Sequence, residues 1–300
     1  MRCLIWRQHR WQAVWTILTV SVVCALLLDL GLSAQHYLTG YHTWLRELAA
    51  AGCPPPTAHS GDFHVRSAQT CLELKDRYPG GLQAAFSSNF NTALVLSQYG
   101  LPLVFAFIGA MLGAPLVARE AEHRTHLTAW TQSVSRRRWY TTKIAALAAV
   151  LTVAGVATGA LNAWLQHQLT AGDVGSSRWG WFASINLVLA GEAVMAFALA
   201  VAFGAILRRT LPAIGAAMAT FVVLLLGARW IVVNAAPVTK APGPHSAAPP
   251  GSWIISSHPE TLTYHPAGQY WPLQLALVTI LLATAAGALA SGWRATQRVI

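Results

Sequence analysis

Residues Gly113–Lys143 read GAPLVAREAEHRTHLTAWTQSVSRRRWYTTK and separate two apolar runs by a short polar segment. This segment is basic, since it contains Arg119, Arg124, Arg136–Arg138 and Lys143. Short loops rich in Lys and Arg remain on the cytoplasmic side of a membrane. The stretch therefore predicts two membrane-spanning helices joined by a cytoplasmic loop.

The middle of this loop has the pattern of an amphipathic helix. Glu120–Val134 contains neither Pro nor Gly, and Leu127, Trp130 and Val134 recur at helical spacing. We expect a short helix at the membrane surface, with an apolar face that meets lipid or a partner protein.

The composition of the chain agrees with a membrane protein. Of its 300 residues, 55% are hydrophobic and only 10% are charged, whereas soluble domains carry about 25% charged residues. A net charge of +10 would indicate nucleic-acid binding in a soluble protein. Here the basic residues lie in short loops between apolar runs, so membrane topology explains the charge and we expect no nucleic-acid partner.

Six apolar runs are long enough to cross a bilayer. They are residues 13–33, 96–117, 144–165, 181–207, 211–233 and 273–293. We therefore predict an all-α membrane protein, a single transmembrane domain over residues 1–300 with larger loops at 35–92 and 234–270. The second of these loops is rich in proline, which argues against a regular element there.

Lys and Arg give the orientation of these spans. They are dense in the two tails and in the loops after the second and fourth spans, and sparse in loops 35–92 and 234–270. This bias places both termini in the cytoplasm and the two larger loops outside. We expect a multi-pass protein of the bacterial plasma membrane.

Two cysteines, Cys53 and Cys71, lie in the first large loop, near a short helix expected at Thr43–Ala51. Because the charge bias places this loop outside, where thiols are oxidised, we expect a disulfide between them. Two free thiols are the alternative.

Few polar residues fall within the spans. Asp29, Glu192 and Arg229 are charged, and each is expensive in lipid unless it faces protein or water. Structural or interfacial roles are favoured for Asp29 and Arg229. Glu192 has two interpretations: it lines a substrate path together with Asn162, or it pairs with an arginine.

Small residues at four-residue spacing occur in two spans. Gly109 and Gly113 form one such pair, and Gly155 and Gly159 form another. Pairs of this kind let helices approach closely. We favour packing within one chain over a seam between two chains.

Tests for chemistry within the chain are negative. None of its three lysines belongs to the Gly-Lys-Ser/Thr motif that binds nucleotide phosphates, and there is no His-Glu-x-x-His motif. We therefore predict no catalytic residue, no metal site and no cofactor in this chain. If transport is driven by ATP, the nucleotide is bound by another polypeptide.

The basic loop also follows a known order of residues: Glu, a spacer, Thr, an apolar helical patch, Val-Ser-Arg, and Lys at the next span. The matching residues are Glu120, Thr125, Leu127, Val134, Ser135, Arg136 and Lys143. Arg124 and Ser133 depart from the order, at positions where Gly and Pro are common. In this pattern the loop resembles the first cytoplasmic loop of ABC transporter permeases of the type-2 exporter class.

This resemblance implies that the loop is a coupling helix that docks on a separate ABC ATP-binding subunit. The contact residues it implies are Glu120, Glu122, Thr125, Leu127, Trp130, Val134, Ser135 and Arg136. It further implies a homodimer or heterodimer of permeases that exports a substrate. The alternative is a self-sufficient secondary carrier or a membrane-embedded enzyme, although the paired repeats and broken helices of many carriers are not evident.

Overall fold

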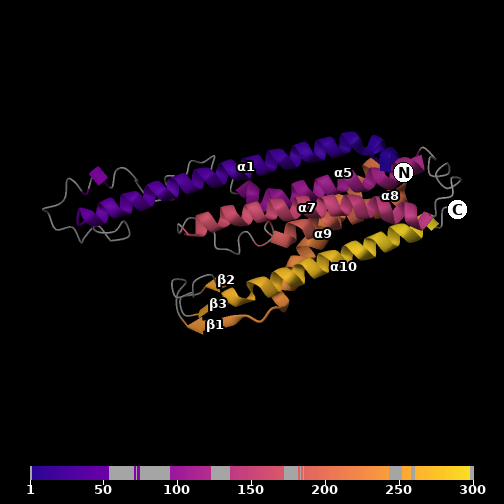
Figure 1. The fold of residues 1–300 in the computed structure, drawn as a ribbon. Helices are drawn as coiled ribbons and strands as arrows, with labels where there is room; N and C mark the ends of the chain where they lie inside the picture. Colours follow the sequence, from indigo (N-terminus) through magenta and orange to yellow (C-terminus); the bar gives the residue numbers. More distant parts are fainter. Residues whose placement is uncertain are drawn as a thin grey trace.

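The computed structural model describes residues 2–53, 71, 73–74, 95–122, 136–171, 182, 184, 186–242, 252–257 and 261–297. Within these residues, six helices are long and apolar enough to cross a membrane (Figure 1). They are α1 (Arg2–Ala50), α5 (Leu101–Glu122), α7 (Arg136–Ala171), α8 (Asn186–Leu207), α9 (Thr210–Ala235) and α10 (Tyr270–Gln297). A π-helical turn, η1 (Leu96–Gly100), leads into α5. The expected all-α, multi-pass architecture is confirmed.

Helices α5 and α8 form the centre of the bundle. In their most apolar windows 72% and 83% of the residues are buried, against 28% or less in the other four spans. Helices α7, α9 and α10 pack on α8, and α1 packs along α7. The α1–α7 contact is close at Gly31, where the Trp164 ring occupies the space that a Cβ would need.

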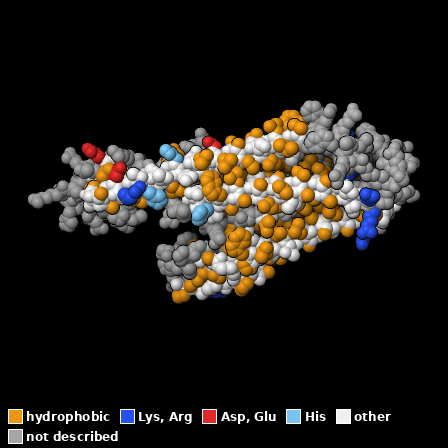
Figure 2. Space-filling view, viewed as in Figure 1, with side chains coloured by type: hydrophobic (Ala, Val, Ile, Leu, Met, Phe, Trp, Pro, Cys, Tyr) orange, Lys and Arg blue, Asp and Glu red, His pale blue; other side chains and the backbone are white. Residues whose placement is uncertain are grey.

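The bundle has two distinct ends. One, which we call the terminal end, holds the beginning of α1 and the end of α10; the other, the sheet end, carries a small β-sheet (Figure 1). Figure 2 shows apolar side chains over the middle of the bundle, with Arg and Lys at the terminal end and again near the far tip of α1. An apolar belt between polar ends is the surface expected of a membrane-spanning protein.

Glycines set the close approach of the central helices. A Cβ at Gly109 of α5 would lie 2.6 Å from the carbonyl oxygen of Ala193, and one at Gly113 would lie 2.5 Å from that of Phe197, both on α8. A Cβ at Gly155 of α7 would lie 2.6 Å from the α8 backbone. These glycines therefore serve packing within one chain, as the sequence predicted.

Helix α1 is longer than the sequence predicted. The expected first span at 13–33 and the separate short helix at Thr43–Ala51 belong to one continuous helix, because no proline interrupts the chain before Pro54. The helix ends at Ala50, and Gly52, two residues later, has a left-handed φ of 70°. There the N–H of Cys53 donates to the carbonyl of Leu48 (2.9 Å), as in a glycine C-cap.

The region 234–270 contains a sheet where proline content argued against one. Strands β1 (Thr239–Pro242), β2 (Trp253–Ser257) and β3 (Thr261–His265) pair antiparallel in the order β1-β3-β2. Proline is tolerated here because Pro242 lies on an edge strand. From Thr261 to Tyr264 the central strand alternates, with Leu262 and Tyr264 buried, and His265 at its end is buried too. The alternation of apolar and polar residues was the missed signal.

Aromatic residues attach the sheet to the helices. Phe182 stacks on Trp253 of β2 with ring centroids 6.3 Å apart and meets Tyr270 of α10 edge-on at 5.7 Å. The side-chain amide of Gln274 donates to the carbonyl of Phe182 (3.0 Å). The sheet is thus fixed to the beginning of α10.

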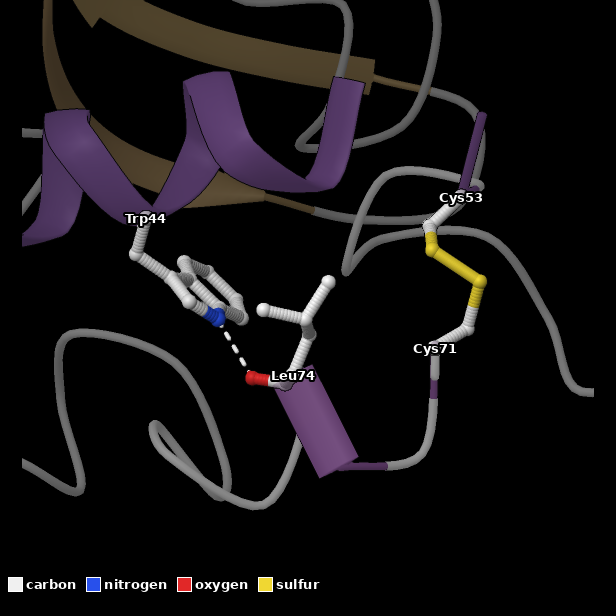
Figure 3. The surroundings of a disulfide bond; sticks show 4 residues. All are labelled: Trp44, Cys53, Cys71 and Leu74. Atoms are coloured by element: carbon white, nitrogen blue, oxygen red, sulfur yellow. Dashed lines mark hydrogen bonds between the residues drawn. A yellow bond between two sulfur atoms is a disulfide. The ribbon is translucent and has the colours of Figure 1, made fainter. Parts of the chain in front are cut away.

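A disulfide closes the loop beyond the far end of α1 (Figure 3). It joins Cys53 and Cys71, whose Cα atoms are 5.7 Å apart. Beside it, the indole N–H of Trp44 donates to the carbonyl of Leu74, and Trp44 and Leu48 are buried. The disulfide and this small cluster hold the returning chain against α1.

Labelling from outside the cell tests this disulfide. We expect an impermeant maleimide to modify Cys53 and Cys71 only after reduction, because neither carries a free thiol before it. Closing a loop of this length stabilises it by about 3 kcal/mol, so Cys53→Ala/Cys71→Ala should make the loop easier to cleave by protease. Modification of both cysteines without reductant would contradict the pairing.

Candidate functional site

The predicted coupling segment connects α5 to α7 at the terminal end. Glu120 and Glu122 lie in the last turn of α5, and Arg136 begins α7. The other expected contact residues lie outside the described residues: Thr125, Leu127, Trp130, Val134 and Ser135. The amphipathic helix expected there therefore stays a prediction.

Glu122 contacts its own chain. Its Oε1 accepts a hydrogen bond from the backbone N–H of Thr210 (3.1 Å), and its Oε2 accepts one from the Thr210 hydroxyl (3.4 Å). Thr210 is the first residue of α9, and its preceding residue, Arg209, supplies no side-chain cap. Glu122 thus caps a helix that begins 88 residues later in the chain.

A two-residue turn sets the position of that helix start. Arg208 and Arg209 alone separate α8 from α9. Arg208 has a φ of 55°, a left-handed conformation that costs a non-glycine residue about 1–2 kcal/mol. Such strain persists only where the surrounding structure imposes it, and here the interlocked α8 and the capped α9 impose it.

The terminal end is strongly basic. Glu122 is exposed there beside arginines that end or begin the helices. The exposed arginines described at this end are Arg119, Arg137, Arg138, Arg208, Arg209 and Arg294. This surface is the one that the sequence assigned to the cytoplasm.

Glu192 is paired with an arginine. Its Oε1 accepts a hydrogen bond from Nη2 of Arg229 at 3.3 Å, and its side chain is fully buried between helices. The Arg229 side chain is 28% exposed. The structure therefore contains the second arrangement considered for Glu192, in which α8 and α9 are joined by an ion pair inside the bundle. Asp29, by contrast, is exposed on α1.

Asn162 has a separate role. Its side-chain amide donates to the carbonyl of Ser184 (3.0 Å), to the Ser184 hydroxyl (3.1 Å) and to the carbonyl of Ser97 (3.5 Å). Asn162 thus ties α7 to the segments that precede α5 and α8. Within the described part of the chain, no hydrogen bond links it to Glu192.

A pocket of about 620 Å³ lies between α1, α5 and α9. Its wall consists of Trp15, Thr16 and Thr19 of α1, six residues of α5 between Leu103 and Leu112, and Met218 of α9. The Thr19 hydroxyl donates to the Trp15 carbonyl (2.8 Å), so it is satisfied within α1. The pocket is therefore apolar, lies within the spans, and is lined by neither Asn162 nor Glu192.

Sequence reasoning missed this pocket because its lining residues are ordinary span residues. Phe107 and Met111, for example, are 52% and 43% exposed in the structure, as lipid-facing residues would be. No polar residue or motif marks them in the sequence. Only the separation of α1 from α5 in space creates the cavity.

Comparison with known proteins identifies the family. A family model described as ABC-2 membrane transporter related matches residues 17–232, from α1 through most of α9. This range includes the coupling segment, most of the pocket wall and the Glu192–Arg229 pair. No curated protein and no solved structure matches the chain significantly. Because the model matches more than half of the 300 residues, the chain belongs to the ABC-2 membrane transporter related family.

Proposed function

We propose that this chain is the permease subunit of an ATP-driven exporter and works with a separate ATP-binding subunit. The observation that carries the proposal is the family match, which spans both the helical bundle and the coupling segment. The match supports a membrane transport component, and the loop pattern at Glu120–Arg136 supports a docking site for the ATPase. The permease itself then performs no chemistry and binds no cofactor.

The terminal end is the cytoplasmic end in this proposal. Its exposed arginines support this orientation, since Lys and Arg are retained inside. Both termini are then cytoplasmic, and the sheet and the disulfide loop lie outside the plasma membrane. An oxidising exterior agrees with the bond between Cys53 and Cys71.

The docking residues of the coupling segment are Glu120, Thr125, Leu127, Trp130, Val134, Ser135 and Arg136. Glu122 is omitted from this set because its carboxylate faces Thr210 of its own chain. Trp130, with Leu127, fills an apolar groove on the ATPase, since buried aromatic anchors dominate such contacts. Two permeases, of one kind or two, form a single transmembrane unit with two ATPase subunits.

The pocket between α1, α5 and α9 receives the apolar part of the substrate. Its wall is apolar and lies at membrane depth, which suits an amphiphile that enters from the bilayer rather than from water. Radiolabelled or fluorescent lipid-like amphiphiles are therefore the first substrates to assay.

Co-purification of the ATPase tests the proposed function. Trp130→Ala should weaken subunit binding by at least about 30-fold, or roughly 2 kcal/mol, and should abolish export while the spans remain inserted. Gln132→Ala, two residues away and about 200° around the expected helix, is the matched control and should bind normally. Equal recovery of the ATPase with both variants would remove the segment from the mechanism, and export without any ATPase would favour a self-sufficient carrier.

A further inference from the structure

The position of Glu122 is unfavourable for its own helix. It is the last residue of α5, and a negative charge at a helix C-terminus opposes the helix dipole. The same charge is favourable at the N-terminus of α9, where unpaired N–H groups and the positive end of the dipole lie. The hydrogen bonds to Thr210 therefore explain why a carboxylate stands there.

Helix α9 is attached differently from its neighbours. Helices α5 and α8 interlock through backbone contacts at Gly109, Gly113 and Gly204, where an added Cβ would meet main-chain atoms within 2.8 Å. In α9, a Cβ at Gly215 or Gly227 would meet no atom within 4 Å. These two glycines thus take no part in packing, and α9 contacts the bundle through a buried stripe formed by Ala213, Ala217, Phe221, Leu225, Ala228 and Val232.

Two polar contacts hold α9 along its length. Glu122 of α5 caps its beginning, and Glu192 of α8 pairs with Arg229. These contacts are 19 residues apart, or about 28 Å along the helix. Met218 of the pocket wall lies between them, about 12 Å from Thr210.

We propose that Glu122 transmits movement of the coupling segment to α9, and that α9 thereby reshapes the pocket at Met218. This inference rests on the proposed function, because the ATPase supplies the movement. The coupling segment, Glu120–Arg136, contains Glu122 as the last residue of α5. A displacement of the segment is therefore applied directly to the carboxylate that holds the start of α9. Glu122 is a positioning residue: it acts through α9 and does not touch substrate.

Two variants separate this role from folding. Glu122→Ala removes the cap by deleting its acceptors. Thr210→Pro removes the donors, the N–H and the hydroxyl, while leaving Glu122 in place. Proline is favoured at the first position of a helix, and Arg209 before it is already extended (φ −135°, ψ 129°), as a residue before proline prefers. Thr210→Pro therefore breaks the contact and is still compatible with a helix that begins at this position.

Export and ATP hydrolysis are measured together, with the ATPase co-purified. We expect both variants to retain the ATPase and its hydrolysis but to lose at least about ten-fold in substrate exported per ATP. Glu122→Gln keeps an acceptor oxygen but loses the charge. Its export per ATP should lie between that of these two variants and that of the wild type. Arg294→Gln, which removes another exposed charge at the same end, is the control and should export normally. Normal coupling in both Glu122→Ala and Thr210→Pro would overturn the proposal.

A distance measurement distinguishes the proposed role of Glu122 from a merely structural one, because a structural role would not change the measured distance. Two nitroxide labels report the position of α9 in the assembled complex, with Cys3 and Cys24 replaced. One is at Leu211, which is 81% exposed at the start of α9, and the other is at Ser291, which is exposed on α10. The wild type should show a change on ATP binding that Thr210→Pro lacks. An unchanged response in that variant, or a static distance in the wild type, would overturn the inference. Failure of the proposed function is distinct, because then no ATPase co-purifies with the wild type.

Discussion

Gly109→Ala is expected to destabilise the folded bundle by about 3 kcal/mol, because the added methyl group meets the backbone of α8. The new Cβ would lie 2.6 Å from the carbonyl oxygen of Ala193 and 3.0 Å from the backbone nitrogen of Phe197. Both are main-chain atoms, so no side chain can rotate away, and α5 and α8 must separate. Overpacking a core typically costs about 1–3 kcal/mol even where side chains adjust.

The control for this prediction is Gly215→Ala on α9, where an added Cβ meets no atom within 4 Å. Both changes gain the same helix propensity, about 1 kcal/mol, so their difference isolates the packing at Gly109. The measurement is the midpoint of thermal unfolding in detergent, and unfolding is detected as the loss of monodisperse protein. Equal midpoints for the two variants would mean that α5 and α8 are not in backbone contact.

Arg229→Leu is expected to have a comparably large effect. It leaves the carboxylate of Glu192 fully buried with no positive partner, and breaking a buried pair in this way costs about 3–5 kcal/mol. Glu192→Leu should cost less, because the Arg229 side chain is 28% exposed and its charge can reach a polar environment. The double variant Glu192→Leu/Arg229→Leu should recover most of the stability, since neither charge remains.

Unfolding midpoints of the two single variants and the double variant complete the cycle. Additive losses would show that the two side chains do not interact in the membrane. Export by the stable double variant then separates the roles of the pair: retained export makes the pair structural, and lost export makes it part of the transport mechanism. Glu192→Gln offers the same comparison with a smaller change of shape.

The six spans were predictable because each is an apolar run of sufficient length, and the runs differ from their helices mainly at the ends. The first helix shows why the ends differ. Hydropathy falls after Ser33, but hydropathy indicates whether a helix is surrounded by lipid or by water, not where the helix ends. The helix itself continues to Ala50 and stops just before Gly52, which adopts a left-handed conformation. The sheet was missed because the proline content of the loop was given more weight than the alternation of polar and apolar residues in Thr261–His265.

The candidate site was predictable only where it is local in sequence. The pairing of Cys53 with Cys71 joins two positions in one loop, which the charge bias had already placed outside. Glu122 and Thr210 are 88 residues apart, and nothing in either neighbourhood indicates the other. Glu192 was recognised as expensive in lipid, and a pairing with an arginine was considered, but which of the two interpretations applied depended on how α8 and α9 face one another.

The length of α1 makes it a lever. At about 1.5 Å per residue, its 49 residues extend roughly 73 Å, more than twice the hydrocarbon thickness of about 30 Å. Its close contact with α7, Gly31 against the Trp164 ring, acts as a fulcrum, with about 28 Å of helix between Gly31 and Ala50. A tilt of about 10° there displaces the disulfide-closed tip by about 5 Å. A fluorophore at the tip would therefore report, from outside the membrane, the angle of a helix that lines the pocket within it.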